Sequence, residues 1–196
     1  SASRDPLALA GDQLEPVEDV REDAVEGVEH VVEQLRDCSD TTLISCNRHE
    51  ANYFEPLGLP LLFDPDDLAF CGPLTGIREL AVRCETDFAF ICPCDTPFVS
   101  SELVYQLVKQ LIDHPDADAC YAKVSGQAHY LPMAIRQKAL ATSLDPVHRE
   151  TRAVKRWLKT LNCVQLSSNI AEKSVLNINS PSDMAKAEVF FRQNEE

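Results

Sequence analysis

The feature that most constrains this fold is a repeated unit: a short apolar run, a loop, and then a longer amphipathic segment. The clearest amphipathic segment covers residues 24–36. Its apolar positions recur at intervals of three and four residues, which predicts a helix with one buried face: Val25, Val28, Val31, Val32 and Leu35. Residues 41–46 are rich in β-branched and apolar side chains and predict a strand. Repetition of this unit is typical of βαβ crossovers, so we expect an α/β fold with a mainly parallel sheet.

The same patterns place the other elements along the chain. Further strands are expected at residues 6–10, 61–63, 87–92, 117–123, 128–134, 163–166 and 175–178. Further helices are expected at residues 76–84, 100–114, 135–144, 151–161 and 181–192. A chain of 196 residues can bury one substantial core, so we expect one domain over residues 1–196.

Charge and hydropathy exclude several classes of protein. The apolar runs are far shorter than the roughly 20 residues of a membrane-spanning helix, and no signal segment opens the sequence. We therefore expect a cytoplasmic protein that binds no membrane. The net charge of −14 argues against nucleic-acid binding, which needs a positive surface. A small anionic ligand remains compatible with this charge, because backbone amides and metal ions can hold it.

The eight cysteines are scattered through expected strands and loops. In a chain of this size they are expected to be free thiols rather than a disulfide framework. Cys92 and Cys94 form the only close pair in the sequence, and no second pair follows it. A zinc site is therefore not expected.

Ligands of open α/β sheets bind outside the carboxyl ends of the strands, so the loops there contain the candidate residues. Asp95 follows the apolar run at residues 87–92 and the stiff Pro93. A carboxylate in that position is a natural ligand for Mg²⁺, which bridges triphosphate oxygens. The alternative interpretation is a carboxylate that stabilises a turn or caps a helix.

Two further groups of residues could contact a ligand. Residues 72–76, Gly-Pro-Leu-Thr-Gly, open an expected helix whose free amides could receive an anion or the edge of a base. Asn47, Asn177 and Asn179 can donate and accept hydrogen bonds to a base, a ribose or a pterin. Ordinary turn and cap formation is the alternative for each of these residues.

In sequence order, five segments resemble the molybdenum cofactor guanylyltransferase family, MobA. They are Leu-Ile-Ser-Cys-Asn-Arg-His at residues 43–49, Asp64, Gly-Pro-Leu-Thr-Gly at 72–76, Phe-Ile-Cys-Pro-Cys-Asp-Thr-Pro at 90–97 and Leu-Asn-Ile-Asn-Ser-Pro at 176–181. The resemblance extends from residue 7 to the C-terminal helix, and the Pro-Cys-Asp-Thr-Pro segment is its most specific part. It implies a three-layer Rossmann-like nucleotidyltransferase fold.

Such enzymes transfer GMP from Mg-GTP to the terminal phosphate of molybdopterin and release pyrophosphate. The resemblance therefore implies Mg²⁺ as cofactor, GTP and molybdopterin as small-molecule partners, and maturation proteins of molybdoenzymes as protein partners. It makes Asp95 the catalytic metal ligand. It also implies nucleotide contacts from Leu9, Ala10, Gly11, Asn47, Asp64, Gly72, Pro73, Leu74 and Asp95, and a molybdopterin side that contains Asn177 and Asn179.

The sequence departs from the family's pattern at one place. The family carries a glycine-rich loop with an arginine and a lysine after the first strand, whereas here Gly11 runs directly into Asp12. The nearby carboxylates of residues 15–23 would repel a triphosphate. Either the chain is a diverged, non-catalytic relative, or a segment between these two residues is lacking from the sequence. A cytidylyltransferase or a sugar-phosphate nucleotidyltransferase also remains open, because a fold does not fix the base or the acceptor.

Overall fold

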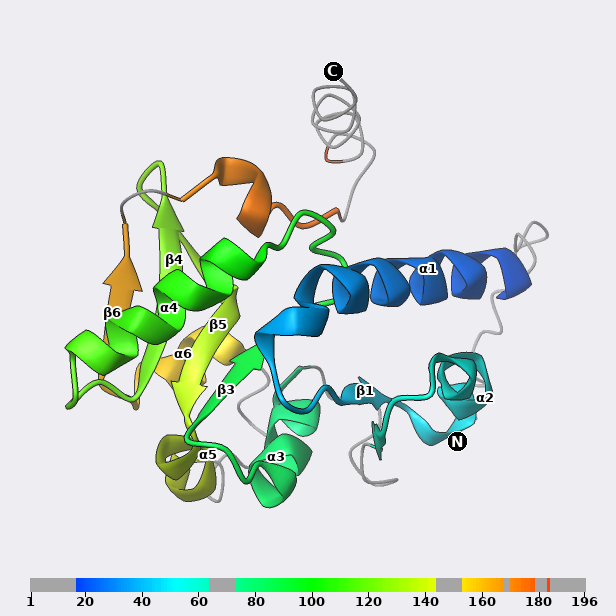
Figure 1. The fold of residues 1–196 in the computed structure, drawn as a ribbon, viewed down its shortest axis with the longest axis horizontal. Helices are drawn as coiled ribbons and strands as arrows, with labels where there is room; N and C mark the ends of the chain where they lie inside the picture. The colour runs from blue at the N-terminus through cyan, green and yellow to red at the C-terminus, as the bar shows by residue number, and fades with distance from the viewer. Residues whose placement is uncertain (1–16, 64–72, 144–152, 168–169, 179–182, 184–196) are drawn as a thin grey trace, which may run out of the picture.

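The computed structural model describes residues 17–63, 73–143, 153–167, 170–178 and 183 (Figure 1). Its α-helices are α1 (Val17–Leu35), α2 (Ala51–Phe54), α3 (Pro73–Arg83), α4 (Ser101–Asp113), α5 (Gln137–Ser143) and α6 (Val154–Leu158). Short 3₁₀ turns are η1 (Arg36–Cys38), η2 (Arg48–Glu50), η3 (Glu55–Leu57) and η5 (Glu172–Val175). The strands are β1 (Ile44–Cys46), β2 (Leu61–Phe63), β3 (Phe88–Ile91), β4 (Ala119–Val124), β5 (Gln127–Arg136) and β6 (Cys163–Leu166).

These strands form two sheets. β1 and β2 pair in parallel, with Ile44 opposite Leu61. The larger sheet has the order β3-β5-β4-β6, in which β6 is parallel to β4 and β5 is antiparallel to both of its neighbours. Three of its four described strands therefore run in one direction. β5 is reversed because it follows β4 through a tight turn, in which Ser125 and Gly126 both have positive φ, as in the two-residue turns that match strand twist.

Helices cover both faces of the larger sheet. In β4, Ala119 and Tyr121 belong to one apolar cluster while Cys120 and Ala122 belong to another, because successive side chains of a strand point to opposite faces. The first cluster includes residues of α3, α5 and α6, and the second includes residues of α1 and α4. Figure 1 shows α4 across the near face of the sheet and α6 behind it. The expected three-layer α/β arrangement is confirmed.

Helix α4 shows how the sequence determines one of these layers. Its N-cap is Ser100, whose side chain accepts a hydrogen bond from the Leu103 amide at 3.3 Å and so satisfies one of the free amides of the first turn. The helix then buries a leucine at every fourth position, since four residues make about one turn. Leu103, Leu107 and Leu111 are 2%, 0% and 0% exposed.

The structure corrects several predicted boundaries. The strand expected at residues 175–178 is wrong: η5 ends at Val175, and the chain then runs to the loop after β3, where Ile178 donates to the Asp95 carbonyl. α5 begins two residues later than predicted because β5 extends to Arg136. α6 is shorter than predicted, and α2 with its flanking 3₁₀ turns was not predicted. The strand expected at residues 6–10 lies outside the described residues, as does the closing helix at 181–192 apart from Asp183.

Helix α3 approaches β1 so closely that a side chain at Gly76 has no room. A Cβ atom placed there would lie 2.2 Å from the Ser45 hydroxyl oxygen and 3.0 Å from the Ser45 Cβ. The hydroxyl can rotate away, but the Cβ is fixed by the backbone of β1, so a packed neighbour cannot yield fully. Gly76 therefore allows the first turns of α3 to lie beside β1.

We predict that Gly76→Ala lowers the free energy of unfolding by about 1 kcal/mol, because overpacking outweighs the gain of up to ~1 kcal/mol in helix propensity. Urea denaturation measures this change. Combined with Ser45→Gly, which removes both contacts, Gly76→Ala should become neutral or stabilising, whereas Ser45→Ala should relieve the cost only in part. An equal cost in all three backgrounds would contradict this steric explanation.

Candidate functional site

The centre of the site is the loop between β3 and α4, at residues 92–100. Pro93 ends the strand, and Cys94 and Asp95 form a turn. A second turn follows, closed by a hydrogen bond of 3.2 Å from the Val99 amide to the Thr96 carbonyl. Thr96 and Val99 are 0% and 1% exposed, so the loop is anchored by its own buried residues. Asp95 lies beside them as a partly buried residue, and its Oδ1 atom is buried.

The segment after η5 packs against this loop from a distant part of the sequence. The Ile178 amide donates to the Asp95 carbonyl at 2.8 Å. The Thr96 hydroxyl donates to Asn177 Oδ1 at 3.2 Å, and Asn177 Nδ2 lies 3.4 Å from Asp95 Oδ2. The structure thus brings together Asp95 and Asn177, which the sequence indicated separately. Their contact is direct, so Asn177 faces the carboxylate itself.

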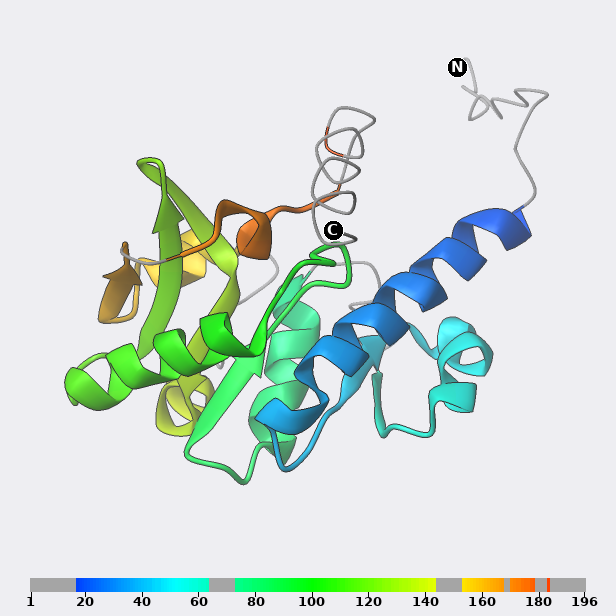
Figure 2. The same ribbon diagram turned by 45° about the horizontal axis from the view of Figure 1, so that its top comes forward.

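Helix α1 supports the same loop from the other side. Gly27 lies against the turn, where an added Cβ would be 3.2 Å from the Cys94 carbonyl oxygen. Both ribbon views place the loop after β3 alongside α1 (Figure 2). A glycine on this face of α1 therefore sets how closely the helix approaches the turn that carries Asp95.

Asn47 occupies the corresponding position after β1. Its backbone amide and its side-chain Nδ2 both donate to Glu50 Oε2, at 3.1 and 3.0 Å. These bonds fix the orientation of the side chain and leave its Oδ1 atom buried, with no hydrogen-bond partner within the described part of the chain. A buried acceptor without a partner costs free energy. An amide oxygen in this position can accept a further hydrogen bond.

The first turn of α3, after residue 72, has few side-chain groups available to a ligand. α3 begins at Pro73, where the missing amide hydrogen of proline costs nothing. The side chains of Leu74 and Thr75 are both 5% exposed and belong to the interior. Any ligand contact from these residues must therefore come from their main chain.

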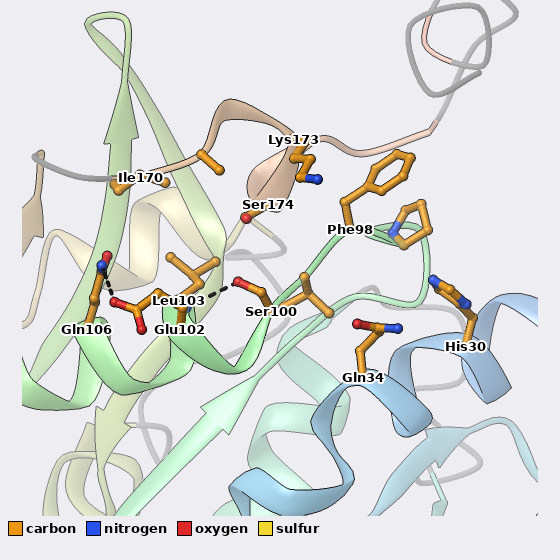
Figure 3. Close-up of a pocket in the computed structure, with 13 residues that line it drawn as sticks. His30, Gln34, Phe98, Ser100, Glu102, Leu103, Gln106, Ile170, Lys173 and Ser174 are labelled. Carbon is orange, nitrogen blue, oxygen red and sulfur yellow. Dashed lines mark hydrogen bonds between the residues drawn. The ribbon is translucent and has the colours of Figure 1, made fainter. Parts of the chain in front are cut away.

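A pocket of about 410 Å³ begins two residues beyond Asp95. Figure 3 shows its floor of loop and α4 residues between α1 on one side and η5 on the other. Its lining combines apolar and polar side chains: His30, Gln34, Phe98, Leu103, Gln106 and Lys173 are among them. No sequence pattern predicts this pocket, because its walls come from α1, α4 and η5 and only the fold brings them together.

The other predicted site residues are outside the described part of the chain. These are Leu9, Ala10, Gly11, Asp64, Gly72 and Asn179. The carboxylates of residues 15–23 also fall in the undescribed segment or on the first turns of α1, where side chains are not described. Sequence reasoning missed Thr96 and Gly27. Their signals were the threonine that directly follows Asp95 and a single glycine inside an otherwise strong helix pattern.

Three further findings concern metal ligands, cysteines and membrane-spanning helices. Within the described ranges, no three His, Cys, Asp or Glu side chains are grouped to hold a metal ion. The seven cysteines that the structure describes form no disulfide bonds. None of the helices in the described part is both long and apolar enough to cross a membrane.

Solved structures with the same architecture are nucleotidyltransferases and related proteins. Molybdopterin-guanine dinucleotide biosynthesis protein A from Archaeoglobus fulgidus superposes with a TM-score of 0.70 at 21% identity, over 85% of this chain and 86% of that protein. The 2-C-methyl-D-erythritol 4-phosphate cytidylyltransferase of Thermus thermophilus gives a TM-score of 0.64 at 15% identity, over 85% and 89%. The chain therefore has the Rossmann-like fold of the nucleotidyltransferase class.

Sequence relatives define the family more closely. A family model described as the MobA-like NTP transferase domain matches residues 24–166. The molybdenum cofactor guanylyltransferase of Methylibium petroleiphilum is 31% identical, over 72% of this chain and 72% of that protein. The protein of the same name from Rhodopseudomonas palustris is 30% identical, over 81% and 77%. The chain belongs to the MobA-like NTP transferase domain family and is a nucleotidyltransferase. The match begins after Leu9, Ala10 and Gly11, which thus precede it.

The two cysteines near Asp95, Cys92 and Cys94, have thiol pKa values that are raised in part by the charge of this carboxylate. Burial, followed by the charges of Asp95 and Cys94, raises the pKa of Cys92 to about 12. Desolvation and then the charge of Asp95 raise the pKa of Cys94, whose side chain is exposed at the turn. The thiolate is the reactive form of cysteine. Cys94 should therefore be the reactive member of the pair, and its rate should depend on Asp95.

We predict that Asp95→Asn lowers the pKa of Cys94, because the nearby negative charge that disfavours the thiolate is removed. Alkylation of Cys94 at pH 8 should then be faster than in the unmodified protein, while Cys92 should stay almost unreactive in both. Peptide mass spectrometry over a pH series measures each site separately. A Cys94 rate that does not respond to the substitution would show that the carboxylate does not act on this thiol.

Proposed function

We propose that this nucleotidyltransferase transfers GMP from Mg-GTP to the terminal phosphate of molybdopterin, forming the guanine dinucleotide cofactor and pyrophosphate. The observation that carries the proposal is the placement of Asp95 after β3, fixed by the Ile178 amide on one side and by Gly27 of α1 on the other. The relatives named guanylyltransferase, at 30–31% identity, support the choice of GTP and molybdopterin.

The donor atoms around Asp95 fit a magnesium ion that arrives with a nucleotide. Mg²⁺ is usually held by one or two carboxylates together with substrate phosphates, not by a cage of protein ligands. A single oriented carboxylate, with no larger cluster in the described residues, agrees with that donor set. When bound, the ion would neutralise triphosphate charge and stabilise the charge that develops on the leaving pyrophosphate.

Asn47 supports the nucleotide part of the proposal. Its buried Oδ1 can accept a hydrogen bond from a ribose hydroxyl or from an amino group of the base. Glu50 holds the amide so that this oxygen does not rotate away. Asn47 thus acts by orienting the guanosine. The other proposed contacts of the guanosine are Asp64, Gly72, Pro73, Leu74 and the segment Leu9, Ala10 and Gly11.

The reaction needs positioning more than acid–base catalysis. The acceptor phosphate is largely ionised near pH 7, since its second pKa is about 6. One of its oxygens forms a bond to the α-phosphorus of GTP, and the bond from that phosphorus to the oxygen of the β-phosphate breaks. Pyrophosphate carries away the electron pair, so no residue must remove a proton. The protein's contribution is to orient the two substrates and to hold Asp95 at the reacting phosphates.

The fold does not determine which nucleobase the protein selects, because a cytidylyltransferase shares this fold. We predict that GTP binds at least tenfold more tightly than CTP when each is titrated with Mg²⁺ in a calorimeter. Tighter binding of CTP would favour a cytidylyltransferase. If neither GTP nor CTP binds, the result would favour a non-catalytic relative that lacks the phosphate-binding loop.

We predict that Asp95→Ala lowers the rate of metal-dependent pyrophosphate formation by at least a hundredfold, without loss of the fold. The matched control is Asp116→Ala, an exposed carboxylate just before β4, which should retain the full rate. Circular dichroism checks the fold, and coupled detection of pyrophosphate measures turnover. A rate for Asp95→Ala equal to that of the control would remove Asp95 from the mechanism.

A further inference from the structure

Thr96 is a fully buried polar residue whose hydroxyl lies next to the site. Its exposed fraction is 0%, and its hydroxyl donates to Asn177 Oδ1 at 3.2 Å. Burying a hydroxyl is costly unless it is hydrogen-bonded. The Asn177 amide satisfies that requirement, and a valine at this position would fill nearly the same volume without the bond. The hydroxyl therefore has a role that packing alone does not explain.

The hydrogen bond from Thr96 also determines which way the Asn177 amide points. An amide oxygen only accepts and an amide nitrogen only donates. With Oδ1 held by the Thr96 hydroxyl, Nδ2 faces Asp95 Oδ2 at 3.4 Å. This second distance is long for a hydrogen bond, so the contact between the amide and the carboxylate is a weak one. The chain of contacts runs from Thr96 through Asn177 to Asp95.

The backbone of the same segment is fixed as well. The Ile178 amide donates to the Asp95 carbonyl at 2.8 Å, so Asn177 cannot move far from the loop. η5 buries Ser174 and Val175 just before it, at 3% and 1% exposed, and thereby anchors the segment from the other end. Asn177 is thus held at Asp95 by contacts on both sides of it.

We propose that Thr96 and Asn177 are positioning residues for Asp95, and that Asn177 acts on the metal-binding carboxylate instead of on the acceptor's pterin. This inference rests on the proposed function, because it assumes that Asp95 holds the metal of the nucleotide. Residues that orient a metal ligand typically change metal affinity 10- to 100-fold when they are replaced. The resulting effect should appear in metal binding and not in binding of the acceptor.

The test measures the affinity of the full chain for Mn²⁺ in the presence of GTP, by electron paramagnetic resonance of the free ion. Thr96→Val should bind Mn²⁺ about tenfold more weakly, because the amide loses its orienting bond. Thr96→Ser keeps the hydroxyl and should restore the affinity to within about twofold. Asn177→Ala should weaken Mn²⁺ binding to a similar degree, and it leaves the buried Thr96 in place if the valine variant folds poorly.

Thr160→Val provides the matched control. The Thr160 hydroxyl donates to the Trp157 carbonyl at 2.7 Å, just after α6 and outside the site. Thr160 is exposed and its bond is to a main-chain carbonyl, so this variant loses a threonine hydroxyl away from the site and should bind Mn²⁺ as the unmodified protein does. Steady-state kinetics add a second measurement: for Thr96→Val, the KM of the acceptor should stay within twofold, while turnover should recover as Mn²⁺ is raised.

Two results would overturn the inference while leaving the proposed function in place. One is a Thr96→Val protein that binds Mn²⁺ as tightly as the unmodified protein. The other is an Asn177→Ala protein with a raised KM for the acceptor and unchanged Mn²⁺ affinity, which would assign Asn177 to the acceptor. A different result, no binding of Mn²⁺ by the unmodified chain with GTP, would reject the proposed function and with it this inference.

Discussion

The hydrogen bond from the Ile178 amide to the Asp95 carbonyl is the constraint on which the site depends. It joins the loop after β3 to the segment after η5, which is far along the chain and belongs to no described strand. Because both partners are main-chain groups, the bond fixes backbone position whatever the side chains do. The side-chain contacts between Thr96, Asn177 and Asp95 lie beside this bond.

The three-layer core positions that loop at both of its ends. α1 and α4 cover one face of the sheet through Val31, Leu103, Leu107 and Leu111, and the loop runs directly into α4. Burial of these side chains is the main favourable contribution to stability. The position of the loop is therefore set by the packed helix α4 at one end and by the paired strand β3 at the other. This is the usual arrangement in which a rigid scaffold presents a functional loop.

Much of this architecture could be predicted from the sequence, because strongly periodic segments have few alternatives. β2 and β6 were predicted with the correct bounds, and α4 followed from its serine cap and leucine spacing. The segment after η5 was predicted wrongly as a strand, because Val175 and its apolar neighbours have strand propensity. In the structure this segment pairs with the loop after β3 and not with another strand. The candidates Asp95, Asn47 and Asn177 were visible as residue types, but the contact between Asp95 and Asn177 required the fold. The pocket beside them could not be predicted, since its walls converge from three separate elements.

The charge of the chain bears on the metal that we propose for this site. A net charge of −14 repels a free triphosphate, and an ion on the Asp95 carboxylate would offset that repulsion. The direct test is a crystal structure with GTP and Mn²⁺, in which anomalous scattering locates the metal. We predict an Asp95 oxygen bound directly to an ion that also binds the nucleotide phosphates, as expected for a hard divalent cation with oxygen ligands. A bound nucleotide whose metal is held by other groups, with Asp95 out of reach, would contradict it.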